Sequence, residues 1–312
     1  MTEIIAGRRV ATRVRRRRLS LRQRQAILGF IFVMPWILRF LWLDLGPFIA
    51  SLYLSFTEYS VLSSPKWIGL DNFIRALTDD RLFWKSVWNT VYYAGVSVPL
   101  GLIMGFSVAL VLNSKIRGVT IYRTCFYLPS IVPSVASAVL WLWLLNASRI
   151  GLLNYALGKV GIEPINWLGD PAMAKPSLIL MSLWGVGGGM IIYLAGLQSI
   201  PEHLYEAAEI DGANWWQRLH RITIPLMTPT IFFNLIMGII GSFQVFNAAF
   251  IITQGGPANA TLFYMLYLYN NAFSYFKMGF ASALAWMLFV IILALTVIVF
   301  RTSGRWVYYE RQ

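Results

Sequence analysis

The sequence predicts an all-α membrane protein with six transmembrane helices, and three observations lead to this fold class. Of the 312 residues, 58% are hydrophobic and only 12% are charged, whereas a soluble chain of this length is less apolar and more charged. The apolar residues fall in blocks of about twenty, the length that a helix needs to cross roughly 30 Å of hydrocarbon. Basic residues are concentrated in alternate connecting segments, as in chains that cross a membrane several times.

A basic tail, residues 1–25, precedes the first span, and its many arginines face a single acid, Glu3. Such a run could bind nucleic acid, but an apolar span follows it at once, so we favour contact with anionic lipid head groups and no nucleic acid. The apolar stretch Ala26–Ala50 is longer than a typical signal-peptide core, and no clear cleavage site closes it. We therefore expect a retained first helix.

The six predicted spans form one membrane domain, residues 26–301, followed by a short cytosolic tail, residues 302–312. The spans are Ala26–Ala50, Thr90–Asn113, Arg123–Leu145, Pro176–Leu197, Thr228–Ile252 and Phe280–Phe300. Several contain proline, whose missing donor must be compensated by neighbours, so we expect kinked helices in a bundle. The glycine run Gly187–Gly189 indicates either close helix packing or an opening for a ligand, and the sequence favours neither.

The distribution of lysine and arginine predicts the orientation. The N-terminal tail, the segments around residues 114–123 and 198–227, and the C-terminal end from Arg301 onward together hold 17 of the 26 lysines and arginines. The other connecting segments are longer in sum but poorer in positive charge. The positive-inside rule therefore places both termini and the segment between the fourth and fifth spans in the cytosol. The outer connections, 68–85 and 151–161, have the pattern of short amphipathic helices and turns.

The residues needed for several kinds of chemistry are missing. The nearest match to a nucleotide-binding P-loop, around Gly158-Lys159, has Leu153 and Val160 where glycine and serine or threonine are required. One cysteine and two histidines cannot form a disulfide or an ordinary metal cluster, and both histidines lie in one loop, which excludes a Ser/His/Asp triad. Uphill transport by this chain would therefore take its energy from a partner.

Ionisable residues within the spans are also rare. The first span contains Arg39 and Asp44, which are five residues apart and do not share one face of a straight α-helix. We expect Arg39 to pair with a polar group on another helix or subunit, and the alternative is that it faces a transport path. No proton relay is evident from these residues.

The stretch 199–229 is the longest charged segment between two apolar blocks. Pro201 suits the first turn of a helix, and the negative charges of Glu202 and Glu206 would interact favourably with the positive N-terminal end of the helix dipole. Gly212 suits its C-terminal end, and a second short helix is expected from Asn214 to about Thr223, limited by Pro225. Two short helices bent at a glycine would form a compact knob for docking to a partner, or an amphipathic elbow lying on lipid.

The same stretch resembles a known motif. Glu206-Ala-Ala, Asp211-Gly212-Ala213 and Ile222-x-Ile224-Pro225 resemble the EAA motif of permease subunits of ATP-binding cassette (ABC) importers, with Leu219 and Ile224 as mild departures. Further stretches resemble the carbohydrate-uptake branch of this family, the relatives of the maltose-importer permeases. They are Ser55-Phe56-Thr57, Gly69-Leu70-Asp71-Asn72, Asn89-Thr90, Asn166-Trp167-Leu168-Gly169, Leu197-Gln198-Ser199-Ile200-Pro201, Gly241-Ser242-Phe243-Gln244 and Gly255-Gly256-Pro257.

The resemblance implies a type I ABC importer permease fold with a cytosolic coupling helix, in a bacterial or archaeal cytoplasmic membrane. It implies a non-catalytic subunit that binds no cofactor, working with a second homologous permease, an ATPase dimer that uses ATP and Mg, and an extracytoplasmic solute-binding protein. Glu206 would make a polar contact in a cleft of the ATPase. The other residues implied in this coupling are Ala207, Ala208, Asp211, Gly212 and Ala213.

The resemblance to the maltose-importer permease also implies a substrate path. The corresponding positions are Ser182, Gly185, Val186, Gly189, Gly238, Gly241 and Ser242. Most are smaller here, so the site should be wide or should rely on the partner permease. Trp184, Gln244 and Asn247 are nearby alternatives that could stack on a sugar or hydrogen-bond it. Helix packing is the competing explanation for each of these residues.

The expected function is import of sugars or oligosaccharides. Import of glycerol 3-phosphate or another polar solute by the same machinery is the alternative, although Arg39 is then the only cation available for a phosphate. A stand-alone secondary carrier or channel is an alternative of a different class. A membrane enzyme is not supported by any catalytic set of residues.

Overall fold

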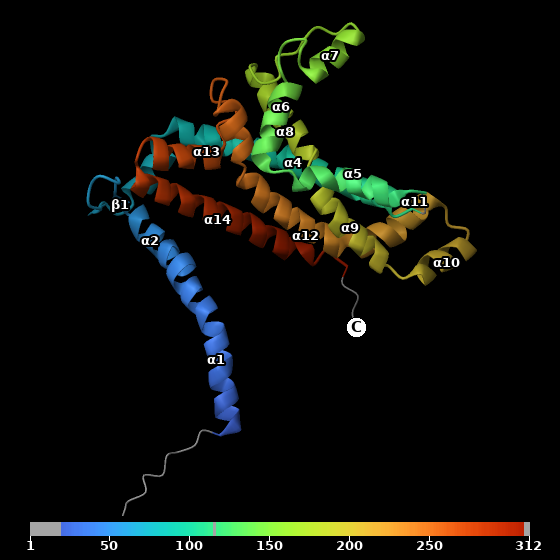
Figure 1. Cartoon of the computed structure of the whole chain (residues 1–312), viewed down its shortest axis with the longest axis horizontal. Coiled ribbons are helices and arrows are strands. Elements are labelled where there is room, and N and C mark those ends of the chain that lie inside the picture. The colour runs from blue at the N-terminus through green and yellow to red at the C-terminus, as the bar shows by residue number, and fades with distance from the viewer. Residues whose placement is uncertain (1–19, 115–116, 309–312) are drawn as a thin grey trace, which may run out of the picture. The chain divides into compact units, whose positions relative to one another are not determined.

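The computed structural model describes residues 20–114 and 117–308, and most of this length is helical (Figure 1). Residues 1–19 of the predicted basic tail and residues 309–312 of the predicted C-terminal tail lie outside the described residues. The chain divides into two units, of which the first ends at Ser51 and the second begins at Leu52.

The first unit is one long apolar helix interrupted by a wider turn. It consists of α1 (Leu21–Arg39), a π-helical segment (Phe40–Leu45) and α2 (Gly46–Ser55), whose last turn belongs to the second unit. The helix begins before the predicted Ala26 because Ser20 and Gln23 form a capping box, which supplies partners for two backbone N–H groups. No residue of α1 is buried.

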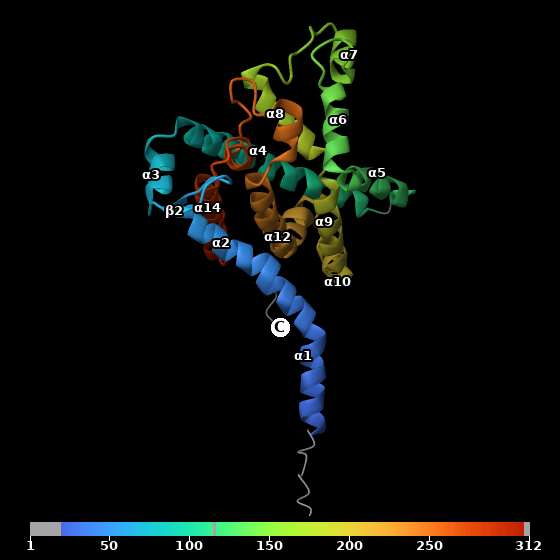
Figure 2. The same ribbon diagram turned by 60° about the vertical axis from the view of Figure 1, so that its left-hand side comes forward.

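The second unit consists of helices and one short antiparallel hairpin. In chain order its elements are β1 (Thr57–Glu58), β2 (Lys66–Trp67), α3 (Asp71–Thr78), α4 (Arg81–Leu112), α5 (Val119–Ile131), α6 (Ser134–Leu144), α7 (Leu152–Lys159), α8 (Pro171–Leu183), α9 (Gly187–Ser199), α10 (Glu202–Ile210), α11 (Trp215–Arg218), α12 (Ile224–Phe243), α13 (Tyr264–Tyr269) and α14 (Met278–Ser303), with π-helical segments at Leu219–Thr223, Ala249–Thr253 and Asn270–Ser274. In the hairpin Thr57 is opposite Trp67. α7 and α10 lie at opposite ends of this unit (Figure 2).

Two π-helical segments stand directly before prolines. The segment Phe40–Leu45 precedes Gly46-Pro47, and the segment Leu219–Thr223 precedes Ile224-Pro225. A proline inside an α-helix clashes with the carbonyl four residues before it, and a wider turn with i→i+5 bonding moves that carbonyl away. The helix therefore continues through both prolines. The expectation that Pro225 limits the second helix of the 199–229 stretch is wrong, since Trp215–Phe243 is one continuous helix.

The described helices match the predicted spans in number only when bent pairs are counted as single spans. Four helices are long and apolar enough to cross a membrane: Leu21–Ser55, Arg81–Leu112, Trp215–Phe243 and Met278–Ser303. The predicted third span falls on α5 and α6, which are bent by 100° at Pro133, and the predicted fourth span falls on α8 and α9, bent by 45°. The described chain thus has between four and six candidate membrane helices. The helix expected to reach Ile252 ends at Phe243.

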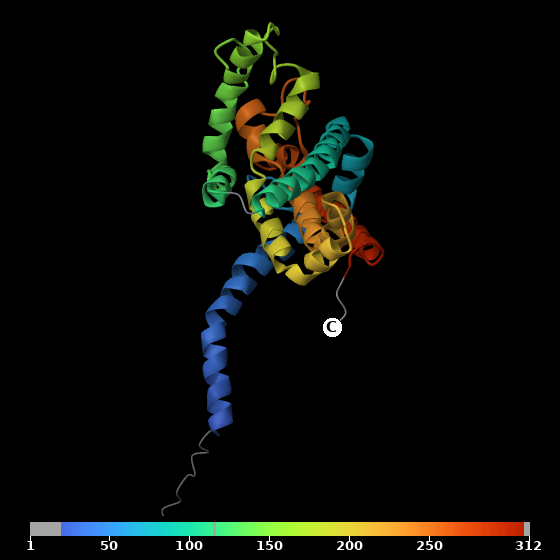
Figure 3. The same cartoon turned by 90° about the vertical axis from the view of Figure 1, so that its right-hand side faces the viewer.

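Helix α4 is the centre of the second unit. It crosses beside α9 and α12 and also packs on α8 (Figure 3). A cluster of buried apolar side chains joins α4, α9 and α12 near their ends at residues 112, 197 and 227, and a second cluster joins α4 with α8, α13 and α14. α12 also runs beside α14 (Figure 1). Packing of this kind, rather than water exclusion, holds helices together in a bilayer.

One member of the glycine run is required for close helix packing. A Cβ atom at Gly187 would lie 2.2 Å from the Phe126 carbonyl oxygen of α5, a distance that real atoms do not adopt. At Gly188 the nearest atom, Ser130 Cβ, would be 4.0 Å away. Gly187 therefore allows α9 to begin against the backbone of α5, and Gly188 does not limit this approach.

We predict that Gly187→Ala destabilises the protein and that Gly188→Ala does not. The first change forces the backbones of α5 and α9 apart, and overpacking of this kind costs about 1–3 kcal/mol. The second adds a methyl group where there is room and replaces a poor helix former. Thermal unfolding of the detergent-purified variants measures both, and equal melting temperatures for the two would contradict the packing role.

Candidate functional site

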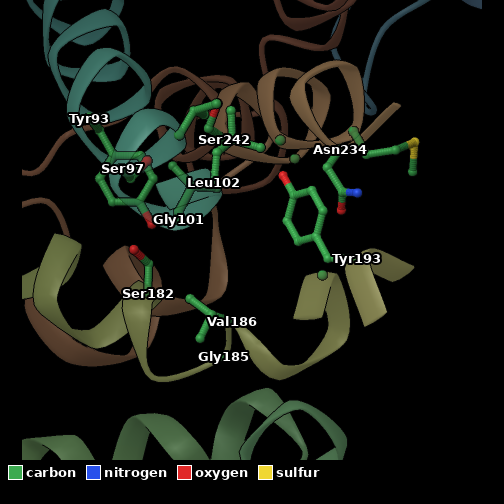
Figure 4. A pocket seen from close by; sticks show the side chains of 16 residues that line it. Tyr93, Ser97, Gly101, Leu102, Ser182, Gly185, Val186, Tyr193, Asn234 and Ser242 are labelled. Atoms are coloured by element: carbon green, nitrogen blue, oxygen red, sulfur yellow. The ribbon is translucent and has the colours of Figure 1, made fainter. Parts of the chain in front are cut away.

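Small side chains on α4, α8, α9 and α12 leave a cavity of about 320 Å³ within the second unit (Figure 4). This volume is near the lower end of the range of about 300–1,000 Å³ for small-molecule sites. The lining side chains carry hydroxyl, amide, aromatic or apolar groups, or are glycine, and none carries a formal charge. They are Tyr93, Ser97, Val98, Gly101, Leu102, Ser182, Gly185, Val186, Gly189, Tyr193, Asn234, Met237, Gly238, Gly241, Ser242 and Val245.

The structure brings together all the path residues that were taken from the maltose-importer permease. Each of them lines this one cavity: Ser182, Gly185, Val186, Gly189, Gly238, Gly241 and Ser242. They come from two chain segments that are far apart in the sequence and that both pack on α4. The structure thus places these seven residues at one cavity, while their role in binding a ligand stays a prediction.

The glycines of this set serve two purposes. A Cβ atom at Gly241 would meet nothing within 4 Å, and one at Gly185 would meet only the Ser182 carbonyl oxygen at 3.6 Å. In contrast, a Cβ atom at Gly238 would lie 3.2 Å from Val98 of α4, and one at Gly189 would lie 3.3 Å from Asn234 Oδ1 of α12. Some glycines therefore leave space in the cavity, and others allow the helices around it to approach.

The three alternative path residues lie outside the cavity lining. Trp184 lines a smaller neighbouring hollow, which shares Tyr93, Ser182 and Gly185 with the cavity, and its ring packs edge-on against Trp141 of α6. Gln244 follows the end of α12 and is exposed. Asn247 donates a hydrogen bond of 2.9 Å to Ser134 Oγ at the start of α6. This bond uses one of the two N–H donors of the amide group that was expected to face a ligand.

Sequence reasoning missed five polar or large residues of the cavity. They are Tyr93, Ser97, Tyr193, Asn234 and Met237. A signal was present for part of this set, since Tyr93, Ser97 and Gly101 are spaced four residues apart and share one face of a helix. Asn234 is also the one amide residue of α12, within an apolar stretch where polar groups are costly and usually functional.

Tyr93 and Ser182 form one polar end of the cavity. The Tyr93 side chain of α4 and the Ser182 side chain of α8 lie near each other on this side of the cavity (Figure 4). Ser182 Oγ donates to the Ile179 carbonyl oxygen at 2.7 Å, and Ser242 Oγ donates to the Ile239 carbonyl oxygen at 2.9 Å. Both serines therefore retain oxygen lone pairs that can accept a further hydrogen bond.

Tyr193 forms the other end of the cavity, and its hydroxyl has no hydrogen-bond partner among the described residues. The residue is 1% exposed. Its ring lies against Gly105 of α4, at 3.4 Å from an ideal Cβ there, and edge-on to Phe106. A buried hydroxyl without a partner costs about 1–3 kcal/mol. Most buried polar groups have partners, so this one requires an explanation.

The predicted knob is present between the two cavity-lining helices α9 and α12. α10 ends at Ile210, Gly212 adopts a left-handed conformation with φ of 75°, and α11 begins at Trp215 after a capping box between Asn214 and Gln217. The Ala213 N–H donates to the Ala208 carbonyl oxygen at 2.8 Å, which closes the bend. The first short helix and the bend at Gly212 are therefore present as expected, whereas the expected second short helix is the first part of the continuous helix Trp215–Phe243.

The knob is held by its own contacts and presents a free acidic face. Glu209 forms an ion pair with Arg218, and the Tyr205 hydroxyl hydrogen-bonds Thr223 Oγ1 at 2.9 Å. Glu206 and Ala207 are exposed, and neither these nor Asp211 takes part in an ion pair within the described chain. The side chains implied in coupling thus remain available for another molecule.

Comparison with known proteins gives a family match. Residues 97–309 match the family described as "Binding-protein-dependent transport system inner membrane component". This segment includes the cavity-lining parts of α8, α9 and α12 and the whole knob.

Individual relatives and a solved structure agree with this match. The chain is 47% identical to a probable ABC transporter permease protein of Bacillus subtilis, covering 90% of this chain and 92% of the relative. It is 35% identical to a trehalose/maltose transport system permease protein of Thermococcus litoralis, covering 89% of this chain and 94% of the relative. It is also similar to a chain of a bacterial alginate ABC transporter that was solved with an alginate pentasaccharide-bound periplasmic protein. The sequence identity is 27% and the TM-score is 0.81, and the match covers 90% of this chain and 96% of the other.

Proposed function

The chain belongs to the family of binding-protein-dependent transport system inner membrane components, and from this premise we propose that it is a permease subunit of an ATP-driven importer of neutral sugars or oligosaccharides. The observation that carries the proposal is the uncharged cavity between α4, α8, α9 and α12, with hydroxyl and amide groups at its walls. The relatives named for trehalose, maltose and alginate transport support the carbohydrate class.

The absence of charge in the cavity lining favours a sugar over glycerol 3-phosphate. A phosphate buried in a membrane protein needs cations to offset its desolvation, and the sixteen lining residues include no lysine or arginine. A sugar needs hydroxyl and amide partners and aromatic rings, which Ser97, Ser242, Asn234 and Tyr93 supply. A stand-alone proton-coupled carrier is disfavoured for a similar reason, because the same residues include no carboxylate and no histidine.

We propose that a second, homologous permease lines the other half of the path. The glycines and valines that line the cavity give this chain space but few polar contacts, so a complete site requires further groups. An extracytoplasmic solute-binding protein would deliver the sugar, and the alginate relative solved with a periplasmic protein supports such a partner. The chain itself would carry out no catalysis and bind no cofactor.

We propose that the knob transmits force from an ATPase dimer, which binds and hydrolyses ATP with Mg. Glu206 and Ala207 would enter a cleft of the ATPase, where alanine allows close approach, while Ala208, Asp211, Gly212 and Ala213 shape the bend. The connection to the cavity supports this role. α9 ends at Ser199, just before α10, and the helix Trp215–Phe243 continues from the knob to Gly238 and Gly241 without a break.

The proposed topology has six spans, each bent pair counting as one, in a bacterial or archaeal cytoplasmic membrane with both termini in the cytosol. The concentration of basic residues in alternate segments supports this orientation. The positions of α7 and α10 at opposite ends of the second unit agree with an outer loop and an inner loop (Figure 2).

We predict that Glu206→Lys abolishes ATP-driven uptake, while Glu202→Lys on the same helix leaves it close to wild type. Reversing the charge of a buried polar contact costs about 2–5 kcal/mol, which corresponds to a loss of tenfold or more. Uptake of labelled sugar and co-purification with the ATPase are measured in parallel. Normal uptake and normal ATPase association in Glu206→Lys would refute the coupling role.

We predict that Gly241→Phe blocks uptake by filling the cavity. The matched control is Gly95→Phe on α4, another position where a Cβ atom meets nothing within 4 Å but which lies outside the cavity lining. Both variants should insert into the membrane equally, as judged by the amount of purified protein. If Gly241→Phe retains the uptake kinetics of Gly95→Phe, the cavity is not part of the path.

A further inference from the structure

Tyr193 and Asn234 are polar residues at the same end of the cavity. Neither is among the positions implied by the resemblance to the maltose-importer permease. The Tyr193 hydroxyl is buried without a partner. The Asn234 amide nitrogen donates to the Thr230 carbonyl oxygen of its own helix at 2.9 Å, which leaves Oδ1 as a free acceptor among the described residues. Figure 4 shows the Tyr193 ring extending from α9 toward α12, with its hydroxyl at the end nearer to α12.

This pair is separate from the polar end formed by Tyr93 and Ser182. Asn234 is eight residues before Ser242 on α12, a separation of about 12 Å along the helix axis. A single hydrogen bond spans only about 3 Å, so one polar group of a ligand cannot reach both ends at once. Figure 4 also shows Tyr93, Ser97 and Ser182 on one side of the cavity and Tyr193 and Asn234 on the other.

The direction of the helices identifies which end this is. α9 runs from Gly187 toward the knob, and α12 runs from the knob toward Phe243. Tyr193 therefore lies nearer to the knob than Gly185 does, and Asn234 lies nearer to it than Ser242 does. In the proposed topology this is the cytosolic end of the cavity.

We propose that Tyr193 and Asn234 form a second subsite for a neutral polyhydroxylated ligand, at the cytosolic end, which the ligand occupies after it leaves the Tyr93–Ser182 end. The inference rests on the proposed function. The Tyr193 hydroxyl offers a hydrogen-bond donor and Asn234 Oδ1 offers an acceptor. A sugar hydroxyl can accept from one of these groups and donate to the other at the same time, so the pair suits a polyhydroxylated ligand.

The unpartnered hydroxyl has a role in this sequence of events. In the present conformation the ring packs against Gly105 and Phe106 and lines this end of the cavity. A ligand hydroxyl that reaches this end supplies the missing partner and thereby favours its own movement inward. The subsite would thus affect the rate of passage more than the first capture of the ligand.

Two tyrosine-to-phenylalanine variants test, without any ligand, whether the Tyr193 hydroxyl lacks a hydrogen-bond partner. Tyr264 is buried to the same extent as Tyr193, but its hydroxyl donates to the Leu284 carbonyl oxygen at 2.7 Å. We expect Tyr264→Phe to lower the melting temperature of the purified protein by several degrees, and Tyr193→Phe to leave it unchanged or raise it. An equal decrease in both would mean that the Tyr193 hydroxyl is already paired, and would overturn the proposal.

Uptake by the complete reconstituted transporter tests the subsite itself. Labelled maltose, lactose, trehalose and raffinose are offered with the binding protein, and the variants are compared on a sugar that the wild type imports. We expect Tyr193→Phe and Asn234→Leu each to lower the maximal uptake rate about two- to tenfold, the loss of one hydrogen bond, with little change in the concentration giving half-maximal rate. Unchanged uptake in both variants would overturn the inner subsite alone. A wild-type transporter that imports none of these sugars would overturn the proposed function together with it.

Discussion

The close approach of α9 and α12 to α4 and α5 is the constraint on which the rest of this protein depends. In a bilayer the backbone must satisfy its own hydrogen bonds and the helices must hold together by packing, so small residues determine how near two backbones come. Gly187 allows α9 to meet the backbone of α5, and Gly238 allows α12 to meet Val98. Other glycines, such as Gly241, have no neighbouring atom where a side chain would be, and the space that they leave is part of the cavity.

Continuity of the helices connects this cavity with the knob. The π-helical segment before Pro225 lets α11 and α12 form one rod, so that a displacement of the knob moves Gly238 and Gly241 with it. On the other side only a few residues separate the end of α9 from α10. The Glu209–Arg218 ion pair and the bond from Ala213 to Ala208 link the two halves of the knob, which agrees with the coupling role proposed for it. Rigid elements with a fixed connection are what coupling between distant sites requires.

The sequence predicted the parts of this protein that depend on composition and local chemistry, and it did not predict those that depend on contacts between distant segments. Apolar block lengths located the membrane helices, and Glu202, Gly212 and Asn214 indicated the short helix α10, the bend after it and the start of the next helix. The 100° bend at Pro133 and the continuation through Pro225 could not be read from proline alone, because the outcome depends on whether a π-helical turn forms. Seven cavity positions followed from resemblance, whereas Tyr193 and Asn234 become visible as a pair only when α9 and α12 are side by side.

The most direct test of the central claim, that this chain lines a path whose opening is driven by a partner, is sugar uptake into proteoliposomes of defined composition. The chain is reconstituted alone, and with its partner permease, ATPase and binding protein, each with and without internal ATP and Mg. The account predicts uptake only by the complete assembly and only with ATP. Uptake by this chain alone, or by the assembly without ATP, would contradict it.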